Sequence, residues 1–111
     1  MAIIGIDLGT TNSLAVCYKN NKAEIIKNIF GDIFTPSVVS IDDNREVLVG
    51  KIAKERLISH PDFTAAEFKR IMGMRKTVHI GNRSFSPEEL SSLVLRKIKE
   101  DAEKFLGEPV E

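Results

Sequence analysis

The stretch IGIDLGTTNS, residues 4–13, decides the fold and raises the main functional question. An apolar run stops at an acid, Asp7, and Gly9 and four small polar residues follow it. A second run, from Ser13 to Tyr18, alternates larger and smaller side chains. Two such runs joined by a short polar segment predict an antiparallel hairpin.

The turn of this hairpin has the composition of a phosphate-binding loop. Gly9 leaves the backbone open to close approach, and Thr10 and Thr11 can direct N–H groups toward phosphate oxygens. A carboxylate at Asp7 would repel phosphate unless it acted through Mg²⁺ or its waters, and Mg²⁺ usually keeps several waters. The alternative is an ordinary turn, because turns are generally rich in these residue types. The pattern of a Walker loop is absent, and the segment leads into a strand and not a helix.

The rest of the chain alternates short strands and helices. Strands are expected over residues 3–8, 13–18, 23–28, 38–41, 46–49, 77–80 and 83–85. A short helix is expected over residues 51–58, with Ile52, Ala53 and Leu57 as its apolar face. Residues 63–74 are expected to form a short helix or turns. The clearest helix begins after the N-cap Ser86 and ends at Gly107.

That long helix is expected to bury one face and expose the other. Its apolar residues follow helical spacing: Leu90, Leu93, Val94, Ile98, Ala102, Phe105 and Leu106. The stretch 97–104 alternates in charge and is expected to be a solvated face with ion pairs between residues four apart.

Composition limits the classes of function. The chain has 111 residues, enough for one modest domain. Its formal net charge is zero, which argues against nucleic acid as the main partner. No apolar run approaches the roughly 20 residues that span a membrane. The single cysteine, Cys17, cannot form an internal disulfide, and a reducing, cytoplasmic setting is expected.

Four motifs in order resemble one family. The hairpin sequence GIDLGTTNS resembles the first phosphate motif of the actin, hexokinase and heat-shock ATPase superfamily, in the form found in DnaK-type, seventy-kilodalton heat-shock chaperones. The segments TPSVV (35–39), VGKIA (49–53) and FKRIMG (68–73) are similar to motifs of the same chaperones. The segments SHPD (59–62), ELSSLVLR (89–96) and KEDAE (99–103) are most similar to the HscC branch.

The resemblance implies an α/β fold, a first-lobe piece of the actin-like ATPase (ribonuclease-H-like) fold. It is expected to have an N-terminal antiparallel meander and a small α/β subdomain ending in a long helix. Residues 1–35 would begin the ribonuclease-H-like subdomain, and residues 36–111 would form the smaller insertion subdomain. Residues 109–111 look like the approach to another strand, so we expect a piece of a longer protein. The rest of the ATPase domain and the peptide-binding domain would lie outside it.

The resemblance also implies roles for residues. Asp7 would hold hydrated Mg²⁺, and Gly9, Thr10, Thr11 and Asn12 would wrap the phosphates of ATP or ADP. Lys69 would orient the attacking water and stabilise charge on the γ-phosphate, so Lys69 and Asp7 would be the catalytic residues. The parent would be an ATPase that couples hydrolysis to binding and release of unfolded peptides, with J-domain partners.

The fragment alone would be inactive and could self-associate through an exposed strand edge. Two other functions stay open. A sugar or acetate kinase of the same superfamily shares the acid and the Gly-Thr turn, but would lack the TPS and KRxxG segments. A folded, non-enzymatic module is the third possibility.

Overall fold

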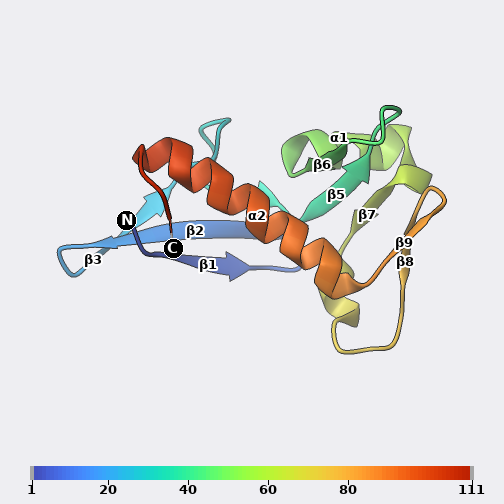
Figure 1. Ribbon diagram of the computed structural model, residues 1–111, viewed down its shortest axis with the longest axis horizontal. Helices are drawn as coiled ribbons and strands as arrows, with labels where there is room; N and C mark the ends of the chain where they lie inside the picture. The colour runs from blue at the N-terminus through green and yellow to red at the C-terminus, as the bar shows by residue number, and fades with distance from the viewer. Residues whose placement is uncertain (1, 111) are drawn as a thin grey trace.

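A computed structural model describes residues 2–110 as a mixed α/β fold built on two antiparallel sheets and a separate two-stranded hairpin (Figure 1). The first sheet contains β1 (Ile4–Leu8), β2 (Asn12–Lys19) and β3 (Lys22–Ile26), and β4 (Thr35–Pro36) also pairs with β2. The expected three-stranded meander is therefore confirmed. The short polar turn allows β1 to pair with β2 in register from Ile4 opposite Cys17 to Leu8 opposite Ser13.

The second sheet has the order β6-β5-β7, with β5 (Val38–Ile41) at its centre. Its outer strands are β6 (Val47–Val49) and β7 (Thr64–Ala66). The helix α1 (Lys51–Ser59) follows β6, and the 3-10 turn η1 (Pro61–Phe63) precedes β7. The strand β7 was not expected from the sequence, because three residues that include two alanines carry no alternating pattern.

The last part of the chain contains a second short turn, a hairpin and the long helix. The 3-10 turn η2 (Phe68–Ile71) confirms the expected turn structure between residues 63 and 74. β8 (Val78–Ile80) and β9 (Arg83–Phe85) form the expected hairpin, and α2 (Pro87–Leu106) follows. The capping box at the start of α2 is present, since Ser86 Oγ accepts from the Glu89 N–H and the Glu89 side chain accepts from the Ser86 N–H. After α2, Val110 forms a parallel bridge with Ala2.

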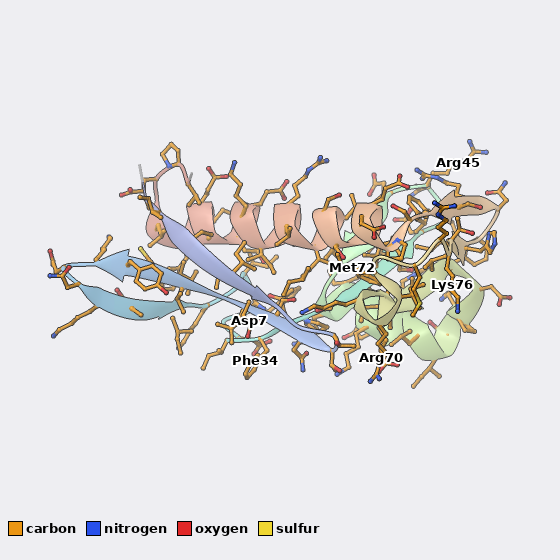
Figure 2. All side chains as sticks on the ribbon, turned by 90° about the horizontal axis from the view of Figure 1, so that it is seen from below. Asp7, Phe34, Arg45, Arg70, Met72 and Lys76 are labelled. Carbon is orange, nitrogen blue, oxygen red and sulfur yellow. The ribbon has the colours of Figure 1, made fainter. Side chains whose placement is uncertain are left out.

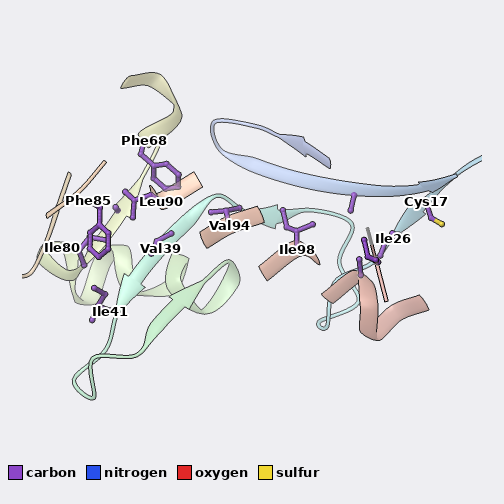
Figure 3. Packing of buried hydrophobic residues seen from close by; sticks show 14 of the residues in the cluster. Cys17, Ile26, Val39, Ile41, Phe68, Ile80, Phe85, Leu90, Val94 and Ile98 are labelled. Carbon is purple, nitrogen blue, oxygen red and sulfur yellow. The ribbon is translucent and has the colours of Figure 1, made fainter. Parts of the chain in front are cut away.

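The helix α2 is the element that joins the two sheets into one body. At about 1.5 Å per residue its 20 residues extend about 30 Å, against a longest molecular dimension of 46 Å. Figure 1 shows it crossing diagonally from the second sheet to the first. Its buried face includes Leu90, Val94, Ile98 and Ala102. These side chains belong to one continuous core with residues from both sheets, as Figure 3 shows.

Three expectations about helix faces were wrong. Ile52 is 47% exposed and Phe105 is 49% exposed, so neither belongs to the core. In α1 only Ala53 is buried, and Arg56 instead holds the helix to β5 by donating to Ser40 Oγ at 2.7 Å. Asp101 was expected on a solvated face, yet it is only 5% exposed, and Lys97 Nζ lies 3.2 Å from its Oδ1.

No helix between residues 2 and 110 is both long and apolar enough to cross a membrane.

Candidate functional site

The end of β1 presents Asp7 to solvent while its neighbours pack inward. Ile6 and Leu8 pack against the core, whereas Asp7 is exposed. This alternation is the ordinary consequence of a strand, whose successive side chains point to opposite faces. Figure 2 shows Asp7 on β1 on the side of the sheet away from α2. Among residues 2–110, Asp7 forms no ion pair, so no neighbouring cation neutralises its carboxylate.

Gly9 is required by the shape of the turn itself. A Cβ atom at this position would lie 2.2 Å from the carbonyl oxygen of Asn12, far closer than any real contact. The sequence-based argument explained Gly9 by access for a ligand. The structure adds a second reason, since a side chain would force the two strands apart just where the turn closes. Any larger residue at position 9 would therefore change the turn.

The turn is attached to the segment that links the two sheets. Ser37, between β4 and β5, donates from Oγ to the Gly9 carbonyl oxygen at 2.8 Å. Its backbone N–H donates to the Thr11 carbonyl oxygen at 2.9 Å. Ser13 Oγ lies 2.8 Å from Ser37 Oγ, and both side chains are buried. Sequence reasoning missed Ser37 as a site residue, although it is the small polar residue that precedes the apolar run of β5.

Lys69 comes from a distant part of the chain to the same turn. Its Nζ donates a hydrogen bond to the Leu8 carbonyl oxygen, across 61 positions of sequence. The preceding residue, Phe68, is 3% exposed and anchors η2 in the core. Glu67 adopts a left-handed conformation with φ of 57°, which turns the chain from β7 into η2. The structure therefore brings Lys69 together with the hairpin, as the resemblance implies.

The segment after η2 is held by the first turn of α2. The Gly73 N–H donates to Glu88 Oε1 at 3.0 Å, and Met72 Sδ lies 3.4 Å from Ser91 Oγ. The hydrogen bond from Gly73 is the main reason that the pKa of Glu88 is lowered from 4.5. Glu88 was not singled out from the sequence. Its contact restrains the chain that leaves η2, and therefore the backbone that carries Lys69.

The site is an open surface that suits an oxyanion. Thr11, Asn12 and Lys69 are exposed, and Thr10 is half-buried. In the part of the chain described, the Thr10 and Thr11 N–H groups donate to no protein acceptor. A lysine ammonium and unpaired backbone N–H groups together form a typical binding environment for phosphate.

The donor set also limits how a metal could be held. Residues 2–110 contain no group of three or more His, Cys, Asp or Glu side chains that could hold a metal ion. Asp7 therefore fits a Mg²⁺ ion that keeps most of its ligands as water and phosphate, and does not fit a cage made by this chain.

Comparison with known proteins identifies relatives. The profile of the family described as "Hsp70 protein" matches residues 3–79. A protein of Halobacterium salinarum named "Chaperone protein DnaK" is 49% identical over 110 residues, covering 98% of this chain and 17% of the relative. A protein with the same name from Mycoplasmopsis agalactiae is 46% identical over 109 residues, covering 98% of this chain and 18% of the relative. The chain thus spans less than a fifth of the length of these relatives.

Proposed function

Because the chain belongs to the Hsp70 family, we propose that it supplies the first phosphate-binding part of an ATPase site in a molecular chaperone. The hairpin turn Gly9–Asn12 would contact the phosphates of ATP or ADP, and Asp7 would hold Mg²⁺ through water. Lys69 would be the second catalytic residue. The observation that carries this proposal is the hydrogen bond from Lys69 to the Leu8 carbonyl, because it brings a cation to the donor-rich turn.

The chemistry follows from the position of the charges. Phosphoryl transfer depends mainly on positioning and on stabilising negative charge on the phosphoryl oxygens. Lys69 carries a compact charge on a flexible stem, so it can leave the Leu8 carbonyl and reach a phosphate or an attacking water. The N–H groups of the turn are fixed dipoles that need no reorganisation when charge develops. Mg²⁺ at Asp7 would supply neutralisation of the phosphate oxygens.

We propose the following function for the whole protein. The parent would couple ATP hydrolysis to binding and release of unfolded peptides, with J-domain proteins as partners and the cytoplasm as its location. Residues 1–35 would begin the ribonuclease-H-like subdomain and residues 36–111 the smaller insertion. The chain by itself would be inactive, because the remaining parts of the site belong to other segments. The segments SHPD (59–62) and ELSSLVLR (89–96) support placing the parent in the HscC branch.

Replacing Lys69 with alanine in the full-length protein tests the proposed role. We expect single-turnover ATP hydrolysis to slow by about 10²–10³-fold, the usual loss for a charge-stabilising donor. Nucleotide affinity should change little, since most phosphate contacts come from the turn. Lys104→Ala is the matched control, because Lys104 is an exposed lysine on α2 remote from the turn. Hydrolysis by Lys69→Ala at the parental rate would contradict the assignment.

A further inference from the structure

We infer that Ser37 is a positioning residue that sets the direction of the phosphate-binding N–H groups of the hairpin turn. This inference rests on the proposed function, since it concerns how that same site is prepared for nucleotide. Ser37 lies between β4 and β5, and it is 2% exposed. It does not face the open surface of the site, so it would act through the backbone of the turn and not by contact with the phosphates.

One residue holds two of the peptide groups in the turn. The Ser37 hydroxyl donates to the Gly9 carbonyl at 2.8 Å, and the Ser37 N–H donates to the Thr11 carbonyl at 2.9 Å. In a trans peptide the carbonyl and the N–H of the next residue point in opposite directions. No cis peptide bond occurs in residues 2–110. Ser37 therefore turns the N–H groups of Thr10 and Asn12 away from itself.

A second serine orients the Ser37 hydroxyl. A hydroxyl has one proton to donate, and that of Ser37 is directed to the Gly9 carbonyl. In the short contact between Ser13 and Ser37, 2.8 Å between the two Oγ atoms, Ser13 must therefore be the donor. Ser13 is 1% exposed, so water does not compete for this bond. The result is a buried relay of two hydrogen bonds, from Ser13 Oγ to Ser37 Oγ and from Ser37 Oγ to the Gly9 carbonyl oxygen.

The relay also connects the turn to Lys69 through the second sheet. Ser37 leads directly into β5, β5 pairs with β7, and η2 with Lys69 follows β7. Ser37 and Lys69, which donate to the carbonyl oxygens of Gly9 and Leu8, thus come from segments that the paired strands β5 and β7 connect. The Thr10 N–H, whose direction is set by Ser37, has no protein acceptor within residues 2–110. A donor held in place but unpaired is arranged for a ligand.

The test measures Mg·ADP affinity in the full-length protein by calorimetry. Ser37→Ala should raise Kd about threefold to tenfold, the loss expected when a fixed donor becomes mobile. Ser37→Thr keeps the hydroxyl and should restore most of the affinity. The matched control is Ser40→Ala, because Ser40 is also a fully buried serine of this segment, with Oγ donating to the Phe63 carbonyl at 2.8 Å. Ser40→Ala should lower thermal stability at least as much as Ser37→Ala, with Kd unchanged.

The outcomes separate this inference from the proposed function. If the parental protein binds Mg·ADP and the Kd of Ser37→Ala is unchanged, the role of Ser37 is overturned and the proposed function stands. The same holds if Ser40→Ala raises Kd as much as Ser37→Ala does. No Mg·ADP binding by the parental protein would overturn both. If Ser37→Ala does not fold, Ser13→Ala replaces it. A raised Kd in Ser13→Ala that returns toward the parental value in Ser13→Thr then supports the relay. An unchanged Kd in Ser13→Ala overturns it.

Discussion

At the scale of single residues, the hairpin turn requires glycine at position 9. Its φ is not in the left-handed region, so the need for glycine does not come from backbone conformation. It comes from the Asn12 carbonyl oxygen, which occupies the place of a Cβ at 2.2 Å. The turn residues could be recognised from the sequence, but this contact could not, because it depends on how closely the two strands approach.

We predict that Gly9→Ala destabilises the protein by about 1–3 kcal/mol, the usual cost of inserting an atom where none fits. The urea midpoint of unfolding measures the effect. Gly5→Ala on β1 is the control, because its Cβ would lie 3.4 Å from the Tyr18 ring, an ordinary contact. Equal midpoints for the two variants would show that the Asn12 carbonyl moves aside without cost.

Buried polar residues were the hardest to predict at this scale. Asp101 lies in a helix stretch of alternating charge, yet it points into a cavity of about 10 Å³ that is also lined by Ala15, Ile26 and Thr35. Its sequence neighbours have the composition of a solvated face. Only the crossing of α2 over the first sheet brings the side chain inside, and that geometry is not encoded in local periodicity.

At the scale of elements, segments with a periodic pattern, a cap or a turn signal were predicted well, and the short strand β7, which has none of these, was missed. The helix α2 has a capping box, a stop at Gly107 and an apolar stripe, and each of these signals is local. The strand β7 has three residues and is stabilised by pairing with β5, in which Val39 lies opposite Ala65. The residues that make β7 a strand are therefore 26 positions away in the chain, and its own sequence does not predict it. The turn η2 was predicted only as a short helix or turns, because its own residue Phe68 is held by core residues that come from other elements.

The contact between α2 and the segment after η2 predicts a pH dependence. The pKa of Glu88 is lowered, first by the hydrogen bond from Gly73, so its carboxylate contributes stability above the unfolded-state value near 4.5. That contribution is lost as the pH falls through the lowered pKa. We predict that Glu88→Gln has a slightly lower urea midpoint than the parent at pH 7, and that the difference shrinks as the pH falls below 4.5.

Glu100→Gln is the control for this pH effect, since Glu100 is exposed in the middle of the same helix. It should shift the midpoint little at either pH. A Glu88→Gln difference that stays constant from pH 7 to pH 3 would mean that the carboxylate charge does not hold the Gly73 segment.

At the scale of the whole molecule, the two sheets depend on one helix. Leu90 packs near Ile80 and Phe85 (Figure 3), while Ile98 lies beside Ala15 and Ile26 of the first sheet. The sequence predicted the helix and the sheets separately. It could not predict that one core joins them, because no local pattern states which face of α2 meets which sheet.

We predict that Leu90→Ala, a fully buried site near the second sheet, lowers the free energy of unfolding by about 2–5 kcal/mol. Because the core is continuous, hydrogen-exchange protection should fall in β2 of the first sheet as well as in β5. Leu95→Ala is the control, since Leu95 is 37% exposed on the same helix. A loss of protection confined to β5, β6 and β7 would show that the sheets unfold independently.

We propose that this chain provides part of an ATP site that other segments complete. Calorimetric titration of Mg·ATP into this chain, and into a form extended to the full length of its relatives, tests it most directly. We expect tight binding by the extended form and at most weak binding by residues 1–111 alone. Absence of binding in both forms would contradict it, because the turn at Gly9–Asn12 would then have only a structural role.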